Sequence, residues 1–164
     1  MRIQIREYYH RNGNLRFRQH YKGEVLHRED GPASESFFED GIIESRRYYR
    51  TGKCHRGDGP AVEGFYQDGR LAFFRYYWND EPHRIDGPAH EAFYEDGATK
   101  YREWYAHNQL HREGGPAHEA FSELLSIEME SSSHGVLITK PEHRRLVSLH
   151  KLNIRNSLDR GVSL

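Results

Sequence analysis

Hydrophobic positions in this chain occur in short runs rich in aromatic residues, separated by residues that favour turns. Ser36-Phe37-Phe38 and Arg47-Tyr48-Tyr49 are two such runs, and Asp40-Gly41 lies between them. An Asp-Gly pair between aromatic runs predicts a tight β-hairpin, because glycine reaches the positive φ that the turn requires. The same pair recurs at Asp68-Gly69 and Asp96-Gly97, and further turns are expected at residues 51–52, 79–80 and 107–108. The pattern therefore predicts an all-β protein.

A seven-residue motif recurs four times along the chain. The segment that begins at His27 reads His-Arg-Glu-Asp-Gly-Pro-Ala, and closely similar segments begin at His55, His83 and His111, always 28 residues apart. Such self-similarity is typical of tandem-repeat proteins. Each unit contains about two strands, and the first 26 residues carry a degenerate copy with Asn12-Gly13 at the hairpin turn. We expect one array over residues 1–122, with equivalent residues of neighbouring units roughly 10 Å apart.

These motifs resemble the MORN family of β-hairpin repeats, in a longer and divergent variant. The resemblance is carried by the His-Arg-x-Asp-Gly-Pro-Ala corner, the Phe-Tyr-x-Asp-Gly turn and the Tyr-Tyr-x-x-Gly segment, and it covers about residues 1–122. It implies an elongated single-layer antiparallel sheet of tandem β-hairpin repeats. Members of the family act as scaffolding, protein-binding or lipid-associated modules, and the divergent type occurs in antitoxin-like and phage-encoded proteins. The corner departs from the usual Gly-rich one, which weakens any transfer of lipid binding.

Composition narrows the class of protein further. The chain has 164 residues, including 11 Tyr, 8 Phe and 2 Trp, and a formal net charge of −1, so overall charge favours neither nucleic acid nor an anionic membrane as partner. The single cysteine, Cys54, has no internal disulfide partner, and the first residues lack the apolar run of a signal peptide. We expect a soluble, cytoplasmic protein.

Repeated polar residues suggest chemistry, but the repeat spacing argues against a reaction centre. We expect no metal, because neighbouring corner histidines should lie roughly 10 Å apart, and we expect histidine and aspartate to hydrogen-bond the corner backbone instead. His83/His90 and His111/His118 are the closest candidate metal pairs. The predicted corner residues are His27, Asp30, His55, Asp58, His83, Asp86 and His111.

Two other candidates for catalysis have structural interpretations. Cys54 precedes His55, but other units place Leu26, Pro82 and Leu110 at its position, so it is interpreted as a packing residue. The glutamates at positions 35, 63, 91 and 119 are expected to form ion pairs with Arg46, Arg47, Arg75 and Arg102 on adjacent strands. No catalytic residue and no cofactor is predicted.

The second strand of each unit interleaves aromatic and arginine residues, which form the candidate binding face. We predict that this face packs on itself, binds a protein, or stacks nucleotide or nucleic-acid bases. Its residues are Arg47, Tyr49, Phe74, Arg75, Tyr77, Trp78, Arg102, Trp104 and Tyr105.

The repeat pattern stops after Phe121, so residues 123–164 are predicted to be an extension with a helix over about 140–158. Residues 134–164 contain six basic and two acidic residues, which gives this segment a net charge of +4. Arg144, Arg145, Lys151 and Arg155 are expected either to help this helix cap the sheet or to contact an acidic partner.

The expected function is non-catalytic protein binding, as an inhibitor or antitoxin-like protein. The alternatives are a nucleotide or nucleic-acid binder and a membrane-surface scaffold. A homodimer through the ends or faces of the sheet is also compatible with the sequence.

Overall fold

The computed structural model describes residues 2–106, 108–121 and 127–128, and every regular element in this part of the chain is a β-strand. The all-β prediction is therefore confirmed for these residues. Within the same ranges, no helix has the length and apolar character needed to cross a bilayer. The helix predicted over residues 140–158 lies outside the described residues.

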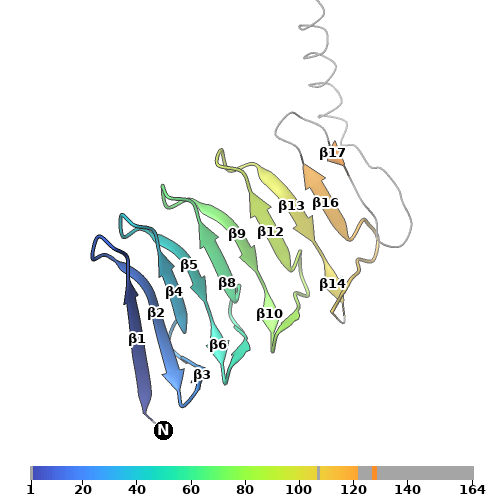
Figure 1. The fold of residues 1–164 in the computed structure, drawn as a ribbon. Helices are drawn as coiled ribbons and strands as arrows, with labels where there is room; N and C mark the ends of the chain where they lie inside the picture. Colours follow the sequence, from blue (N-terminus) through green and yellow to red (C-terminus); the bar gives the residue numbers. More distant parts are fainter. Residues whose placement is uncertain (1, 107, 122–126, 129–164) are drawn as a thin grey trace, which may run out of the picture.

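The strands form one large antiparallel sheet in a single layer (Figure 1). Along the sheet their order is β1-β2-β4-β5-β8-β9-β12-β13-β16-β17, and β3 pairs with β2. The bounds are β1 (Ile3–Tyr9), β2 (Leu15–Lys22), β3 (Val25–Leu26), β4 (Ser34–Phe37), β5 (Ile43–Arg47), β8 (Val62–Phe65), β9 (Leu71–Arg75), β12 (His90–Phe93), β13 (Thr99–Glu103), β16 (His118–Phe121) and β17 (Ile127–Glu128). Because β17 pairs with β16, the sheet extends past residue 122, where we placed the end of the array.

Three short hairpins continue the long strands at their lower ends in Figure 1. They pair β6 (Tyr49–Arg50) with β7 (Lys53–Cys54), β10 (Tyr77–Trp78) with β11 (Glu81–Pro82), and β14 (Tyr105–Ala106) with β15 (Gln109–Leu110). Successive hairpins are linked by backbone hydrogen bonds, such as the one from the Asp80 N–H to the Cys54 carbonyl (2.9 Å). Each hairpin is a separate two-stranded sheet, and such single bonds link it to its neighbour.

The Asp-Gly turns have the predicted geometry. Gly41, Gly69 and Gly97 have φ of 88°, 85° and 87°, values that glycine adopts without steric cost. In each turn the aspartate side chain accepts a hydrogen bond from the backbone N–H two residues later, as from Ile42 to Asp40 at 3.0 Å. The aspartate therefore stabilises the turn that the glycine permits.

The interior of this sheet consists of small residues. Ala33, Ala61 and Ala89 are completely inaccessible to solvent, whereas no large side chain in the described part of the chain is fully buried. Large side chains instead cover small ones on the neighbouring strand, as Phe73 covers Gly64. Neighbouring strands are therefore stabilised by lateral packing along the sheet.

Candidate interaction surface

The two faces of the sheet have different chemistry because side chains alternate along each strand. The register of the main sheet places one row of mostly charged residues across it, and we call this side the glutamate face. In strand order this row is Glu7, Arg18, Glu35, Arg46, Glu63, Phe74, Glu91, Arg102 and Glu119. The opposite side carries a tyrosine in each unit, and we call it the tyrosine face.

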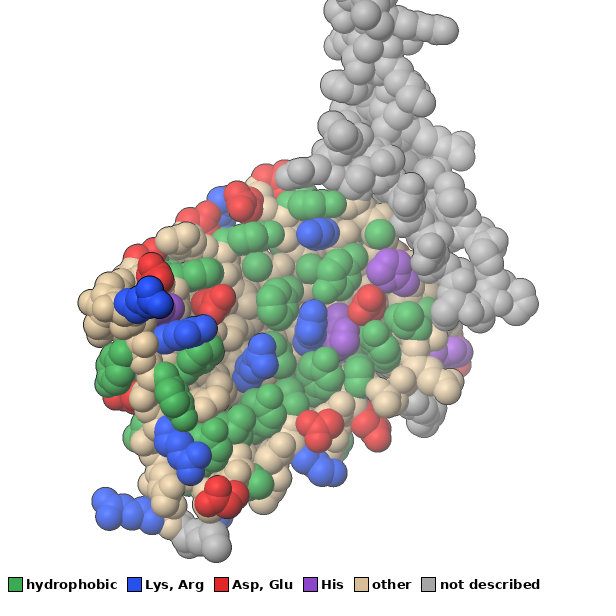
Figure 2. Space-filling view, in the orientation of Figure 1, with side chains coloured by type: hydrophobic (Ala, Val, Ile, Leu, Met, Phe, Trp, Pro, Cys, Tyr) green, Lys and Arg blue, Asp and Glu red, His purple; other side chains and the backbone are tan. Residues whose placement is uncertain are grey.

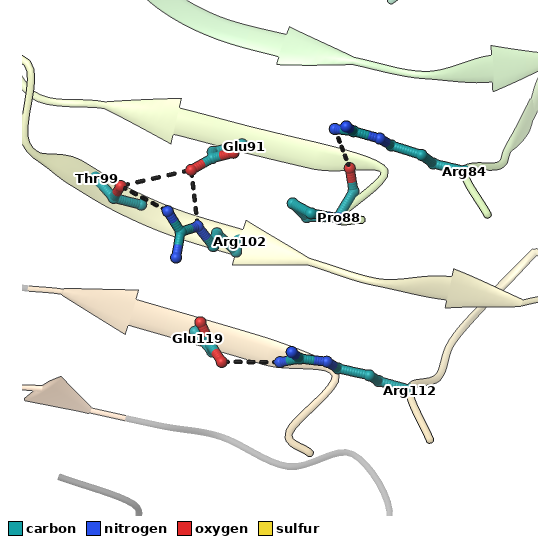
Figure 3. A network of polar contacts seen from close by, with 7 residues as sticks. All are labelled: Arg84, Pro88, Glu91, Thr99, Arg102, Arg112 and Glu119. Atoms are coloured by element: carbon teal, nitrogen blue, oxygen red, sulfur yellow. Dashed lines mark hydrogen bonds and ion pairs between the residues drawn. The ribbon is translucent and has the colours of Figure 1, made fainter. Parts of the chain in front are cut away.

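Several charges on the glutamate face form ion pairs within the sheet, but the predicted pairing of Arg46 is not found among the described residues. Arg102 donates from Nε to Glu91 at 2.7 Å, and Arg112 donates to Glu119 at 2.9 Å (Figure 3). The predicted cross-strand ion pairing is confirmed for Arg102. Arg47 and Arg75 take no part in it, because the register places them on the tyrosine face, opposite Val62 of β8.

Phe74 interrupts the charged row at the position that arginine occupies in the neighbouring units. Its ring packs edge-on against Tyr76 at 5.6 Å and lies 6.0 Å from Phe93. Glu63 beside it has only a distant ion pair with Arg56, at 3.8 Å, and its buried Oε2 has no hydrogen-bond partner in the described part of the chain. The middle of this face is therefore more apolar than its two ends.

The repeated corner is organised by its arginine. Arg84 donates from Nε to Asp86 at 3.0 Å and from Nη1 to the Pro88 carbonyl at 3.4 Å, and its guanidinium lies 4.4 Å from the centre of the Tyr76 ring. A Cβ on Gly87 would lie 3.0 Å from Cζ of this arginine, so glycine provides the space that the guanidinium occupies. Arg28 and Arg56 likewise donate to Asp30 and Asp58, both at 2.8 Å.

Two of the corner histidines, His27 and His55, have contacts other than the predicted ones to their own corner backbone. Nδ1 of His27 accepts a hydrogen bond from the Thr51 N–H of the next unit at 3.0 Å, and the His55 ring packs against Trp78 at 4.3 Å. These two histidines therefore connect neighbouring units, and Arg84 and its equivalents bind the corner backbone. Among the described residues, no group of three or more potential ligands could hold a metal ion.

On the tyrosine face, Tyr21, Tyr49, Tyr77 and Tyr105 recur at the 28-residue spacing, all half-buried. Figure 2 shows this face, where a stripe of hydrophobic side chains runs along the array beside a line of basic, histidine and acidic side chains. Burial raises the pKa of Tyr77, and it raises the pKa of Tyr105 to about 12. The hydroxyls of both residues are therefore neutral at physiological pH.

A polar cluster lies beside the last two tyrosines, and sequence reasoning did not identify it as a cluster. The Glu103 carboxylate accepts a hydrogen bond from Nδ1 of His90 at 3.0 Å and lies 3.3 Å from Nδ1 of His118. His90 is only 7% exposed and lies between the rings of Tyr77 and Tyr105, at 5.4 and 4.9 Å. The hydrogen bond from His90 lowers the pKa of Glu103. The sequence does contain one sign of the cluster, because its positions differ between the repeated segments. The position of His90, for example, is occupied by Ser34 and Val62 in the two preceding segments.

The predicted aromatic and arginine face is therefore divided between the two sides of the sheet. Arg47, Tyr49, Arg75, Tyr77 and Tyr105 lie on the tyrosine face. Phe74, Arg102 and Trp104 lie on the glutamate face, where Arg112 stacks on Trp104 at 3.8 Å. Trp78 is half exposed at the end of its hairpin. The basic residues Arg144, Arg145, Lys151 and Arg155 lie outside the described residues.

Cys54 is buried on the tyrosine face side, paired across its hairpin with Tyr49. Burial raises the pKa of its thiol to about 11, so the reactive thiolate is scarce at neutral pH. Its backbone N–H donates to the Asp80 side chain of the next hairpin at 2.7 Å. The residue therefore contributes to packing between units, in keeping with its interpretation from the sequence.

Comparison of the chain with protein-family models, with curated proteins and with solved structures finds no match.

Proposed function

We propose that this chain is a non-catalytic, MORN-like tandem-repeat protein that binds another protein through its tyrosine face, as an inhibitor or antitoxin-like protein. The repeat assignment is supported by the four-residue strands β4, β8, β12 and β16, which begin 28 residues apart, and by the arginine-centred corner that precedes each of them.

The observation that carries the proposal is the contrast between the two faces. On the glutamate face, Arg18, Arg102 and Arg112 each have a carboxylate within 2.9 Å, whereas Arg46 has no ion pair with a described carboxylate and lies 5.3 Å from the centre of the Phe65 ring. On the tyrosine face, Arg47 and Arg75 have no ion pair with any described carboxylate, and Arg47 is exposed. Tyrosine and arginine are the residue types most enriched where protein interfaces gain their binding energy.

The geometry of the repeat supports binding over catalysis. Equivalent side chains lie two strands apart, roughly 10 Å, which is too far for identical groups to act on one bond. Shallow contacts repeated along an array fit an extended macromolecular surface better than a small substrate, which is usually held in a concave pocket. An acidic protein surface would complement the two arginines that have no ion pair.

Affinity capture with surface variants tests this proposal. The full-length protein, an Arg47→Ala/Arg75→Gln variant and an Arg50→Ala control are used as baits in extract of the source organism, and captured proteins are quantified by mass spectrometry. We expect a partner that binds the full-length protein and the control but is lost from the double variant. Equal capture by all three baits would show that the tyrosine face is not the binding surface.

Nucleic-acid binding by the same face is a second candidate. It is favoured by the Arg6 guanidinium, which lies 4.3 Å from the centre of the Tyr21 ring, because stacked arginine and tyrosine are also the residues that hold single strands. Titration with a labelled oligothymidylate at several salt concentrations tests it. Binding whose affinity falls steeply with salt would favour this function over protein recognition.

Two further predictions concern the chain beyond the described residues and the location of the protein in the cell. One is attachment to a membrane surface through residues 140–160. Flotation of the protein with liposomes tests it, and flotation should be lost when this segment is deleted. The cytoplasmic location stays a proposal, which fractionation of the source cells would test.

A further inference from the structure

Hydroxyl hydrogen bonds hold the rings of Tyr21 and Tyr105 along their strands. The Tyr21 hydroxyl donates to Gln19 at 3.0 Å, and the Tyr105 hydroxyl donates to Glu103 at 3.3 Å. In both cases the partner is two residues earlier on the same face, about 6.8 Å away along the strand. A ring that reaches its partner in this direction lies flat over the sheet, so one ring face is turned outward, where a flat group can stack on it, as the Arg6 guanidinium does on Tyr21 at 4.3 Å.

The spacing of these rings selects a particular backbone conformation in the partner. Tyr21, Tyr49, Tyr77 and Tyr105 continue alternate strands of the sheet, so neighbouring rings are about 9.6 Å apart, or two strand spacings. A polyproline II helix advances about 3.1 Å per residue and repeats every three residues, about 9.3 Å. Over four tyrosines the two spacings diverge by only about 1 Å. A β-strand ligand repeats on one face every 6.8 Å or so and is already about 3 Å out of register at the second ring.

The row beside the tyrosines adds charge to this pattern. Arg47 and Arg75 precede Tyr49 and Tyr77 by two residues on the same face, whereas Glu103 occupies that position before Tyr105. Glu103 is already held by His90 and His118. A ligand with a carboxylate in every third position would therefore pair with the two arginines, and a neutral or basic residue would fit better over the last unit. This asymmetry sets the direction in which the ligand binds.

We infer that the tyrosine face binds a proline-rich polyproline II segment of a protein partner, one triplet per unit, with acidic residues above the units of Arg47 and Arg75. This inference rests on the proposed function, because it names the chemistry of the partner for the same face. Aromatic side chains with outward ring faces are the usual receptors of such preformed, low-entropy helices.

Fluorescence anisotropy with the full-length protein and synthetic peptides tests the inference. The probe is a labelled peptide of four triplets, Gln-Pro-Pro, Asp-Pro-Pro, Asp-Pro-Pro and Gln-Pro-Pro, so that its two acidic residues lie over the units of Arg47 and Arg75, and the matched control has the same composition with the glutamines and aspartates followed by eight prolines. We expect the triplet peptide to bind at least about tenfold more tightly than the control. We also expect affinity to rise with each triplet from one to four and then to level off, because four tyrosines are available. Equal affinity for the two peptides would overturn the inference.

Substitutions on the two faces test whether the peptide binds to the tyrosine face. Arg47→Ala should weaken the triplet peptide by about fivefold, the upper end for an exposed ion pair, and Arg50→Ala, an equally exposed arginine on the opposite face, should leave it unchanged. Tyr77→Phe should retain binding within about twofold, while Tyr77→Leu should lose about fivefold, since only an aromatic ring stacks on proline. Equal effects of Arg47→Ala and Arg50→Ala would contradict the assignment, as would tighter binding of a 12-nucleotide oligothymidylate.

The outcome for the peptide can be separated from that for the proposed function. If the triplet peptide fails to bind while the Arg47→Ala/Arg75→Gln variant still loses its captured protein, the polyproline inference is wrong and protein binding by this face stands. If capture is unchanged by the variant, the proposed function itself is wrong.

Discussion

Replacement of Gly64 by alanine would test whether lateral packing holds the sheet together. Gly64 lies in β8, directly opposite Phe73 of β9. A Cβ built on Gly64 would lie 2.2 and 2.4 Å from Cε1 and Cζ of the Phe73 ring, closer than any ordinary carbon contact. The ring would have to leave its place over the strand, or the two strands would have to separate.

The expected cost follows from this contact. Overpacking by one methyl group costs about 1–3 kcal/mol, and the severity of the overlap places Gly64→Ala near 2–3 kcal/mol of destabilisation. Without the ring, alanine should be the better strand residue by about 0.5–1 kcal/mol, because glycine loses more backbone entropy on folding. The effect of Gly64→Ala should therefore change sign in a Phe73→Ala background, with a coupling energy of about 3 kcal/mol.

Urea unfolding of the two single variants and the double variant, followed by tryptophan fluorescence, measures this coupling. Gly69→Ala is the matched control in the same hairpin. A Cβ there meets nothing within 4 Å, but its φ of 85° disfavours alanine, so we expect a loss of about 1 kcal/mol in both backgrounds. Additive effects of Gly64→Ala and Phe73→Ala, within about 0.5 kcal/mol, would refute packing of the ring over the glycine.

Three further predictions test other contacts. Thr51 has a φ of 51°, which a β-branched residue tolerates poorly, so Thr51→Asn should raise the free energy of unfolding by about 0.5–1 kcal/mol in urea; a decrease would contradict this account. Because the pKa of Glu103 is lowered from its ordinary value of 4.5, its carboxylate stabilises the fold above that pH, and this stabilisation is lost as the pH falls through the lowered pKa. Glu103→Gln should therefore be less stable at pH 7 and lose less stability on acidification, and an unchanged acid transition would argue against the cluster. Cys54 should react with iodoacetamide slowly in the native protein and quickly in urea, whereas fast native labelling would contradict its burial.

Much of the fold could be predicted from the sequence because its determinants are local. The Asp-Gly turns depend on two adjacent residues, and alternation along a strand depends on a period of two, so both can be recognised without knowledge of distant contacts. The same alternation, applied consistently, is enough to separate Arg47 and Tyr49 from Phe74 and Trp104. Treating all aromatic residues of these strands as one surface was the source of that error.

Other features could not be predicted, because they depend on contacts in three dimensions. His83 and Arg84 recur with equal regularity in the corner motif, so their recurrence does not show which side chain reaches the Pro88 carbonyl. The Glu103 cluster is formed by residues from three strands, and its members are found at positions where the copies differ. Strand register was needed to bring them together.

The positions that differ between copies bear on the proposed binding by the tyrosine face. Ala33 and its equivalents are identical in all four corners and are buried. The glutamates at 35, 63, 91 and 119 are identical as well, and of these Glu91 and Glu119 pair closely with arginine. On the tyrosine face, by contrast, the row beside the tyrosines contains a different set in each unit: Gln19, Ser34, Arg47, Val62, Arg75, His90, Glu103 and His118. Apart from the cluster of His90, Glu103 and His118, these side chains form no ion pair among the described residues that would explain the variety. A partner that lies along the array and contacts one unit after another would distinguish the units by these residues, which is why the tyrosine face is the surface where specificity should be sought.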